Sequence, residues 1–447
     1  MNNIIRFVGL VVVWVLAGAP LGAQERPVTL REAVQAARSA SPDVLAAQAR
    51  AEAALQGRRA SAAYRLPTVG LEAGAIRSDD PVAAFGGRLR QGRFTQADFD
   101  PAGLNHPDAL TDWSGAIGAM WAPLDFSADA AYQAAGAEAE AAGLGAAWAA
   151  RAAAFRGEAR YVEAVGAERR LAAAASALAA AEENERIMGL RRDEGLLTDA
   201  DLLQAKAALE GARARHIDAR RAVDDARGRL AVAMGWEGGV VPVPADSVFP
   251  ALPAHLPADV AERPDLLASA AAVRAADARV SQARRSRLPT VQGFARLATH
   301  STKMFDGAEE DWTLGFQVRV PLFTGFAISS HERAASAMRE AAAQDHRGLL
   351  REAEAQLAEA VRAVASARQG SAAAEAGAEA AAEAARLMRR RFEEGLTTTA
   401  DLLGVEAQAA ALATQAVNAR LGLHLAVARL AFLSDTTTSD FQQGFDR

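Results

Sequence analysis

An internal duplication limits what this chain can fold into more than any other feature of its 447 residues. The tetrapeptide Arg-Leu-Pro-Thr at 65–68 recurs at 287–290, at an offset of 222 residues. Segments 195–203 and 395–403 share a Gly-Leu pair and an Asp-Leu-Leu triplet, now at an offset of 200 residues. The smaller offset places an insertion of about 22 residues in the first half, and the repeat predicts two halves of the same architecture.

Each half is predicted to be mainly α with a small β part: a helix, two short strands and a hairpin of long helices. The leading helices are expected at 29–63 and 259–286. The first repeat is assigned to 24–235, with strands 67–77 and 112–123 and a helical hairpin over 127–234. The second is assigned to 259–433, with strands 289–299 and 311–321 and a hairpin over 326–433. A linker rich in Pro and Gly, 236–258, joins them, and 434–447 is a polar tail.

The first helix of each hairpin is unusually long. A helix over 127–193 spans roughly 100 Å at 1.5 Å per residue, so other helices must cover it. Large residues recur every seven positions beside an alanine seam, which allows close helix packing. These residues are Leu202, Leu209, Val223 and Leu230, with Ala205, Ala212, Ala219, Ala226 and Ala233 in the neighbouring phase. On the helices alone, a coiled-coil structural protein of the cell envelope without a pore remains the alternative.

Composition narrows the classes of protein further. The net charge is −6, from 49 basic and 55 acidic residues, so no basic face for a nucleic acid is indicated. The absence of cysteine excludes disulfides and thiolate metal sites. Residues 1–23 are typical of a cleaved secretory signal peptide, with an apolar run too short for a membrane span, although a single anchor is the alternative. No later apolar run is expected to cross a membrane as a helix.

The strands argue against a plain rod. Along 312–322 every second residue is apolar, with polar residues or glycine and proline between them. About ten residues of such alternation with terminal aromatics is typical of a transmembrane barrel, and a half-buried soluble sheet is the alternative. The expected lipid-facing residues are Trp113, Trp121, Trp312, Phe316 and Val318. Four strands cannot close a barrel in lipid, whereas three chains would supply twelve strands.

Prolines and glycines punctuate the ends of these elements. Pro123 and Pro321 stand where strand becomes helix and lack the donor that a ladder needs. They suit the junction between a barrel and a tunnel of helices, and ordinary strand termination is the alternative. Gly195 and Gly395 suit helix ends that require a positive φ, and Leu196 and Leu396 follow them at the turn. Thr198 with Asp201, and Thr398 with Asp401, have the spacing of a capping box. A hairpin turn with only a structural role is the alternative for both sites.

Three features carry a resemblance to a known family: the duplicated Arg-Leu-Pro strand openings, the Val-Pro-Leu-Phe-Thr-Gly segment at 320–325 and the two Gly-Leu turns. By these features the chain resembles the TolC-like outer-membrane efflux protein family. The resemblance covers the whole chain after the signal peptide. It implies a homotrimer, a twelve-stranded outer-membrane barrel continuing into a periplasmic helical barrel, and passive export in a tripartite efflux or type I secretion system. It also implies a periplasmic adaptor as partner, an inner-membrane pump reached through the adaptor, no enzymatic activity and no cofactor.

By the same resemblance, Gly195, Leu196, Gly395 and Leu396 form the tips that dock the adaptor, and Asp201 and Asp401 lie at the periplasmic aperture. The chain departs from some members, because Thr397, Gly404 and Gln204 replace charged residues found there. A gate held by Arg–Asp links is therefore not expected. The segment 78–111 is expected to be an extracellular loop over the barrel mouth, with a simple insertion as the alternative. The scattered histidines predict neither a metal site nor a catalytic site.

Overall fold

The computed structural model of the chain describes residues 24–236, 239–246, 248–250, 252, 262–304 and 307–434. The expected signal peptide lies outside the described residues, as does nearly all of the polar tail. The chain forms two compact units. One unit comprises the described residues of 1–45, 149–260 and 355–447, and the other those of 46–148 and 261–354. Each unit thus takes segments from both sequence repeats, because the long helices run through both units.

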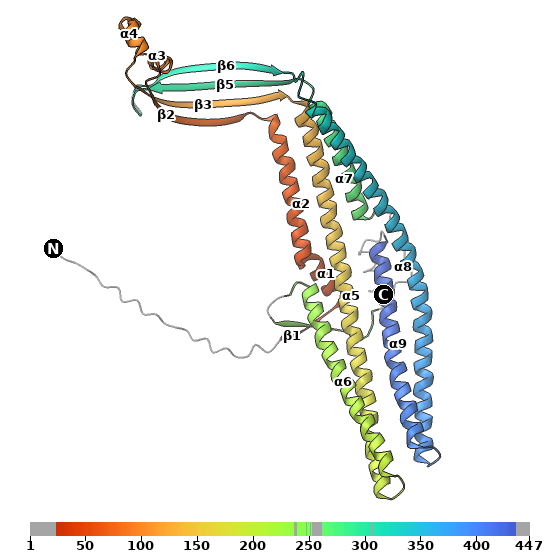
Figure 1. Cartoon of the computed structure of the whole chain (residues 1–447). Helices are drawn as coiled ribbons and strands as arrows, with labels where there is room; N and C mark the ends of the chain where they lie inside the picture. Colours follow the sequence, from red (N-terminus) through yellow and green to blue (C-terminus); the bar gives the residue numbers. More distant parts are fainter. Residues whose placement is uncertain are drawn as a thin grey trace, which may run out of the picture. The chain divides into compact units, whose positions relative to one another are not determined.

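A four-stranded sheet dominates the second unit. Its order is β2 (Thr68–Ser78), β3 (Leu110–Leu124), β5 (Thr290–Ser301) and β6 (Glu309–Arg319), and every pair is antiparallel. All four strands lie within two residues of their expected bounds. This topology places the β2–β3 and β5–β6 connections at one end of the sheet. At the other end the strands join the helices (Figure 1).

Four long helices form the two hairpins. They are α5 (Phe126–Asp193) with α6 (Asp199–Ala233), and α8 (Ala327–Glu393) with α9 (Thr399–Leu433). On α6 the predicted seam is confirmed, since Leu202, Leu209, Val223 and Leu230 are buried beside Ala205, Ala212 and Ala226. Tyr161, Val162 and Val165 of α5 pack with Val223 and Leu230 in one core, and Val364 of α8 packs with Leu423, Val427 and Leu430 of α9 in another. The chain is therefore mostly helical with a small β part.

The prediction of one helix over 29–63 is wrong. Two helices, α1 (Leu30–Ala40) and α2 (Pro42–Ser61), are separated at Ser41, which is extended at φ −61° and ψ 132°. A residue before proline is driven out of the α region by the proline ring, so the helix must break there. The same rule starts α7 (Pro264–Arg285) after the extended Arg263, later than the expected residue 259. Residues 259–261 lie outside the described residues.

A second, small sheet was not predicted. β1 (Gln24–Val28) pairs in parallel with β4 (Val240–Pro244), which lies inside the expected linker. Val28 joins the core of α5 and α6, so this pair attaches the start of the described chain to the first hairpin. Both strands carry proline, which lacks the donor for a ladder and is a poor sequence signal for a strand.

Among the described helices, α9 alone is long and apolar enough to cross a membrane by those two criteria. The α9 helix therefore meets a criterion of length and composition that the sequence was not expected to meet after the signal peptide, which does not make it a membrane helix. The reason is that α9 carries many alanines and leucines for packing in its hairpin, where Leu423, Val427 and Leu430 are buried against α8. A packed core helix meets the same criteria.

One carboxyl group inside the long helices predicts a pH-dependent stability. Burial raises the pKa of Glu158 in α5 from 4.5 to about 7. In the unfolded chain this group ionises near pH 4.5, whereas the folded chain holds its proton until about pH 7. Stability is therefore lost as pH rises between these values. We expect Glu158→Gln to raise the stability by about 1–3 kcal/mol at pH 8, with little change at pH 4.5.

The measurement is the melting temperature of both proteins in detergent across this pH range. Glu182→Gln, at an exposed position of the same helix, is the control and should follow the wild-type profile. A stability gain from Glu158→Gln that is the same at pH 4.5 and pH 8 would contradict the assignment, because a change of packing does not titrate.

Candidate channel wall and hairpin tips

The strand register brings the apolar residues of all four strands to one face of the sheet. Leu71 lies opposite Ile117, Ile117 opposite Leu297, and Leu297 opposite Trp312. Residues directly opposite each other in a ladder point to the same side. Trp113, Trp121, Phe316 and Val318 share this face by the same register. The face is uncovered in the single chain, where Leu71 is 78%, Trp312 76% and Phe316 78% exposed.

This apolar face has a polar boundary at the loop end of the strands. Moving along β6, the residues on the face are Val318, Phe316, Leu314, Trp312 and then Glu310. Arg77 of β2 and Ser301 of β5 occupy the corresponding end positions. The apolar stretch from Val318 to Trp312 is about 20 Å long at 3.4 Å per residue. On a strand tilted by about 40° this stretch covers about 15 Å of thickness, which is part of the apolar band of about 25 Å on a membrane barrel.

The opposite face of the sheet is more polar. Glu72 of β2 and Arg296 of β5 form an ion pair of 3.3 Å across the intervening strand β3. Gln292 lies opposite Gln317 on the same face. Ile76, Met120 and Phe294 are the large apolar residues on this face, and the Phe294 ring covers Gly315, where an added Cβ would lie 2.6 Å from the ring. A side chain at position 315 would therefore have to displace the Phe294 ring.

The β2–β3 connection is folded, which corrects its description as a loop. It contains α3 (Pro81–Arg90), the 3₁₀ helix η2 (Gln96–Phe99) and α4 (Pro101–Asn105). Prolines after the capping residues Asp80 and Asp100 start both α helices. These caps were visible in the sequence as Asp-Pro pairs, but the short helices have too little periodicity to be predicted.

A buried glutamine fastens this segment to the sheet. The Gln91 amide nitrogen donates to the Thr111 carbonyl (2.9 Å), to Asp112 Oδ1 (2.9 Å) and to the Ser301 carbonyl (3.3 Å). Asp112 Oδ2 also meets His300 Nδ1 at 2.8 Å, and His300 Nε2 lies 3.5 Å from Asp311. These contacts join strands β3, β5 and β6 to one another and to the folded segment between β2 and β3.

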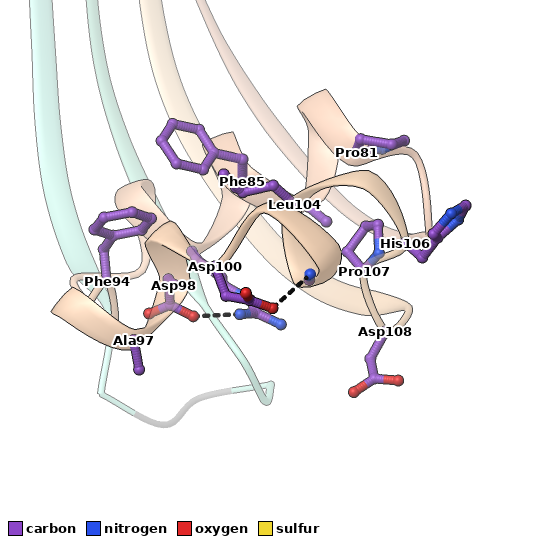
Figure 2. Close-up of a pocket in the computed structure, with 13 residues that line it drawn as sticks. Pro81, Phe85, Phe94, Ala97, Asp98, Asp100, Leu104, His106, Pro107 and Asp108 are labelled. Carbon is purple, nitrogen blue, oxygen red and sulfur yellow. Dashed lines mark hydrogen bonds and ion pairs between the residues drawn. The ribbon is translucent and has the colours of Figure 1, made fainter.

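Figure 2 shows a pocket inside this segment. It has a volume of about 250 Å³ and lies between α3, η2 and α4. Phe94 stacks edge-on against Phe85 (4.9 Å) and Phe99 (5.1 Å), and Arg88 pairs with Asp98. Asp100 accepts a hydrogen bond from the Gly103 nitrogen, as the dashed line in the figure marks. These contacts account for the packing of a small folded cap.

The two predicted junction prolines lie in different settings. Pro123 falls inside β3, where the register to β5 shifts between Trp121 and Leu124 and the strand bulges. Pro321 follows β6, which ends at Arg319, two residues before its expected end, because Pro321 cannot extend the ladder. The chain then turns through Gly325 (φ 59°) and Phe326 (φ 64°), the one non-glycine with positive φ among the described residues. Sequence reasoning did not identify this strained phenylalanine.

Both hairpin turns close the helix end in the same way. Gly195 and Gly395 have φ values of 77° and 75°. The Leu196 nitrogen donates to the Arg191 carbonyl, and the Leu396 nitrogen to the Arg391 carbonyl, each at 2.8 Å. This six-to-one bond is the Schellman arrangement, which requires the positive φ of glycine. It leaves Leu196 and Leu396 69% and 63% exposed at the turns.

The next helix of each hairpin begins with the predicted capping box. Asp201 accepts from the Thr198 hydroxyl at 2.6 Å and from its backbone nitrogen at 3.0 Å. Asp401 accepts from Thr398 at 2.6 Å and 3.4 Å. Hydrogen bonds from Thr198, and then from Thr399, lower the pKa of Asp201, and those of Thr398 do the same for Asp401. Both aspartates are helix caps that remain ionised at neutral pH.

Behind the turns, an apolar cluster joins the two hairpins within the chain. Met188 and Leu202 of the first hairpin are buried with Phe392 and Leu402 of the second. Ile187 and Leu403 pack against this cluster. Arg191 extends the contact, since its guanidinium lies 4.8 Å from the Phe392 ring and donates to the carbonyls of Phe392 and Glu393, each at 2.7 Å. These carbonyls end α8, where the helix dipole favours a cation.

Sequence reasoning missed Arg191 and a second arginine of the same kind. Arg151 of α5 donates to the carbonyls of Ala431 and Ser434 at the end of α9. A basic residue in a long helix carries no local signal that it will cap a different helix. The described residues contain no group of three or more His, Asp and Glu side chains that could hold a metal ion.

The chain thus combines an antiparallel sheet that has one exposed apolar face with two hairpins of long helices. The sequence profile of the outer membrane efflux protein family matches residues 33–236 and 259–434. The chain belongs to this family, which confirms the resemblance stated from its sequence.

Individual relatives agree with this assignment. The chain is 26% identical to the outer membrane protein OprJ of Pseudomonas aeruginosa over 53% of its own length and 51% of OprJ. It is 26% identical to the toluene efflux pump outer membrane protein TtgC of Pseudomonas putida, over 33% and 32% of the two chains. The chain thus aligns with about half, or less, of the length of these curated relatives. The Campylobacter jejuni outer membrane channel CmeC shares its fold, with a TM-score of 0.78, 17% identity and coverage of 93% and 89%.

Proposed function

We propose that this protein is the outer-membrane exit duct of a tripartite efflux or type I secretion system. It would let small molecules or proteins leave the cell passively, while an inner-membrane pump supplies the energy. The observation that carries the proposal is the uncovered apolar face of an antiparallel sheet with a polar boundary. In this reading a cleaved signal peptide exports the chain, the sheet enters the outer membrane and the helices extend into the periplasm.

The open edges of the sheet call for a homotrimer. Strands β2 and β6 each have one neighbour among the described strands, so one side of each offers unpaired backbone groups. Hydrocarbon does not tolerate such groups, and four strands are too few to close on themselves. Pairing β6 of one chain with β2 of the next closes a barrel of twelve strands from three chains. The apolar face with Trp312 then contacts lipid, and the Glu72–Arg296 pair lines the lumen.

At the other end of the chain, the hairpin turns are the proposed docking sites for a periplasmic adaptor. Leu196 and Leu396 are large apolar side chains held out by rigid glycine turns. A trimer presents six such turns. Asp401 and Asp201 would surround the aperture beside them, where closely held carboxylates attract cations.

The trimer is tested by purifying the protein from the outer-membrane fraction in detergent. We expect a native mass of three chains and a β-barrel band that shifts on heating. A soluble periplasmic protein, or a stable monomer in detergent, would instead support the alternative of a coiled-coil envelope protein without a pore. Planar-bilayer conductance of the purified trimer separates a channel from a closed structural assembly.

The aperture assignment predicts an effect of charge at Asp401 that can be separated from its role as a helix cap. Asp401→Asn keeps an oxygen that can accept from Thr398, whereas Asp401→Ala removes both the charge and the acceptor. We expect both variants to weaken block of the channel by multivalent cations, since both remove three charges from the ring. The measurement is single-channel conductance with and without the cation. If neither variant changes the block, Asp401 serves the helix alone.

A further inference from the structure

The apolar cluster behind the turns has a second copy in the sequence, half of whose members lie outside the intrachain contact. The two hairpins repeat at an offset of 200 residues, so each residue of the cluster has a counterpart in the other hairpin. The counterparts of the cluster residues, of Arg191 and of Met388, which also packs against the cluster, make up the second set. The members are Leu387, Met388, Arg391 and Leu402 from the second hairpin, with Met188, Arg192, Leu202 and Leu203 from the first. Met188, Met388, Leu202 and Leu402 belong to both sets. The remaining four residues are exposed and take no part in the intrachain cluster.

Two leucines of the second set are uncovered. Leu203 is 65% and Leu387 47% exposed, whereas their counterparts Leu403 and Ile187 pack on the intrachain cluster. The guanidinium of Arg391, the counterpart of Arg191, makes no hydrogen bond or ion pair to any described residue of the chain. Two apolar residues and the arginine of the intrachain contact are thus present a second time, in positions where they make no such contact.

From this repetition we infer that a neighbouring copy of the same chain makes the second contact. The end of the α8–α9 hairpin of one subunit would pack against the end of the α5–α6 hairpin of the next. Leu387 would bury Leu203 of the neighbouring subunit, and Arg391 would donate to the carbonyls of its Arg192 and Asp193. The inference rests on the trimer of the proposed function and assigns the residues that join its subunits at the hairpin tips.

The acceptors for Arg391 are presented in the same way as those used by Arg191. The Phe392 carbonyl accepts from the Gly395 nitrogen at 3.0 Å and still receives Arg191. The Arg192 carbonyl accepts from the Gly195 nitrogen at 2.9 Å, and no described donor reaches the carbonyl of Asp193. Both carbonyls lie at the C-terminus of a long helix, where a guanidinium is favoured. An arginine can therefore approach the C-terminal carbonyls of α5 in the way that Arg191 approaches those of α8.

The contact between subunits is the weaker of the two. Phe392, which lies beneath Arg191, is replaced by Arg192 in the second set, so the cation–π contact is lost and a second cation is added. Glu406, which binds Asn184 and Arg389 inside the chain, has Lys206 as its counterpart. The hairpins of one chain should therefore stay paired when neighbouring subunits separate at this end.

The chain has no cysteine, so paired cysteines test this contact directly. One variant combines L203C with L387C, and the control combines I187C with L403C at the equivalent positions of the intrachain cluster. Each is treated as an intact trimer with a short thiol cross-linker and run on a denaturing gel. We expect L203C/L387C to lose its monomer band to covalent dimers and trimers, while the control pair remains a monomer with altered mobility.

The failures of the two proposals are distinguishable. Trimers of normal native mass in which L203C/L387C gives no interchain product would overturn the inference and leave the proposed function standing. A protein without a trimeric native mass would overturn both.

Arg391→Ala, added to the L203C/L387C background, tests the arginine itself. It should slow interchain cross-linking several-fold, whereas Arg191→Ala in the I187C/L403C background should slow the intrachain reaction. If Arg391→Ala leaves the interchain rate unchanged, the carbonyl contact is wrong even where the leucines cross-link.

Discussion

Phe316→Arg is expected to prevent assembly of the trimer, whereas Gln317→Arg at the next residue of β6 is expected to be tolerated. Phe316 is on the apolar face of the sheet, opposite Gly293, and Gln317 is on the polar face, opposite Gln292. An arginine facing lipid near the midplane costs about 2–4 kcal/mol per chain, and much less facing a watery lumen. The cost is repeated three times in a trimer.

The measurement is the amount of heat-modifiable trimer in the outer-membrane fraction for each variant. Both variants add one arginine to the same strand at adjacent positions. Effects of expression, added charge and strand propensity are therefore the same in both, and only the face of the sheet differs. Equal loss of trimer from both variants would show that the sheet has no lipid face, and equal tolerance would show that it does not enter a membrane.

Changing both tip leucines, Leu196→Asp and Leu396→Asp, is expected to abolish efflux in cells. Each side chain is exposed at a turn whose backbone is held by glycine, so the substitution removes an apolar contact without disturbing the helix ends. Interfaces depend on a few buried anchors, and placing six charges in six such contacts should remove adaptor binding. Trimer formation and single-channel conductance should stay at wild-type values, because Leu196 and Leu396 belong neither to the sheet nor to the proposed ring of aspartates.

The checks are export by intact cells, cross-linking to the adaptor and bilayer conductance of the purified protein. Val82→Asp in α3 is the control, since Val82 is also a large exposed apolar residue, 80% exposed, but lies in the segment between β2 and β3. If the double leucine variant still exports and still cross-links to the adaptor, the tips are ordinary hairpin turns.

The sequence by itself determined the order of the elements and their faces. The duplication, the period of two in the strands and the Gly-Leu turns are local signals, and each corresponds to an element in the structure. The alternation along β6 even predicted which residues share a face, because a pleated strand has no freedom in that respect. The helix boundaries at Ser41 and Arg263 could also have been predicted from the sequence, since each of these residues precedes a proline. The longer helical pattern around them obscured this signal.

Tertiary structure alone decided which of these elements meet. The pairing of β1 with β4, the Gln91 bonds that fasten the folded segment to the sheet, and the capping of α8 by Arg191 join residues far apart in the chain. Nothing in the neighbourhood of Arg191 in the sequence distinguishes it from the other arginines of α5. Its role exists only because folding brings a foreign helix end, with its unpaired carbonyls and negative dipole, within reach of its guanidinium.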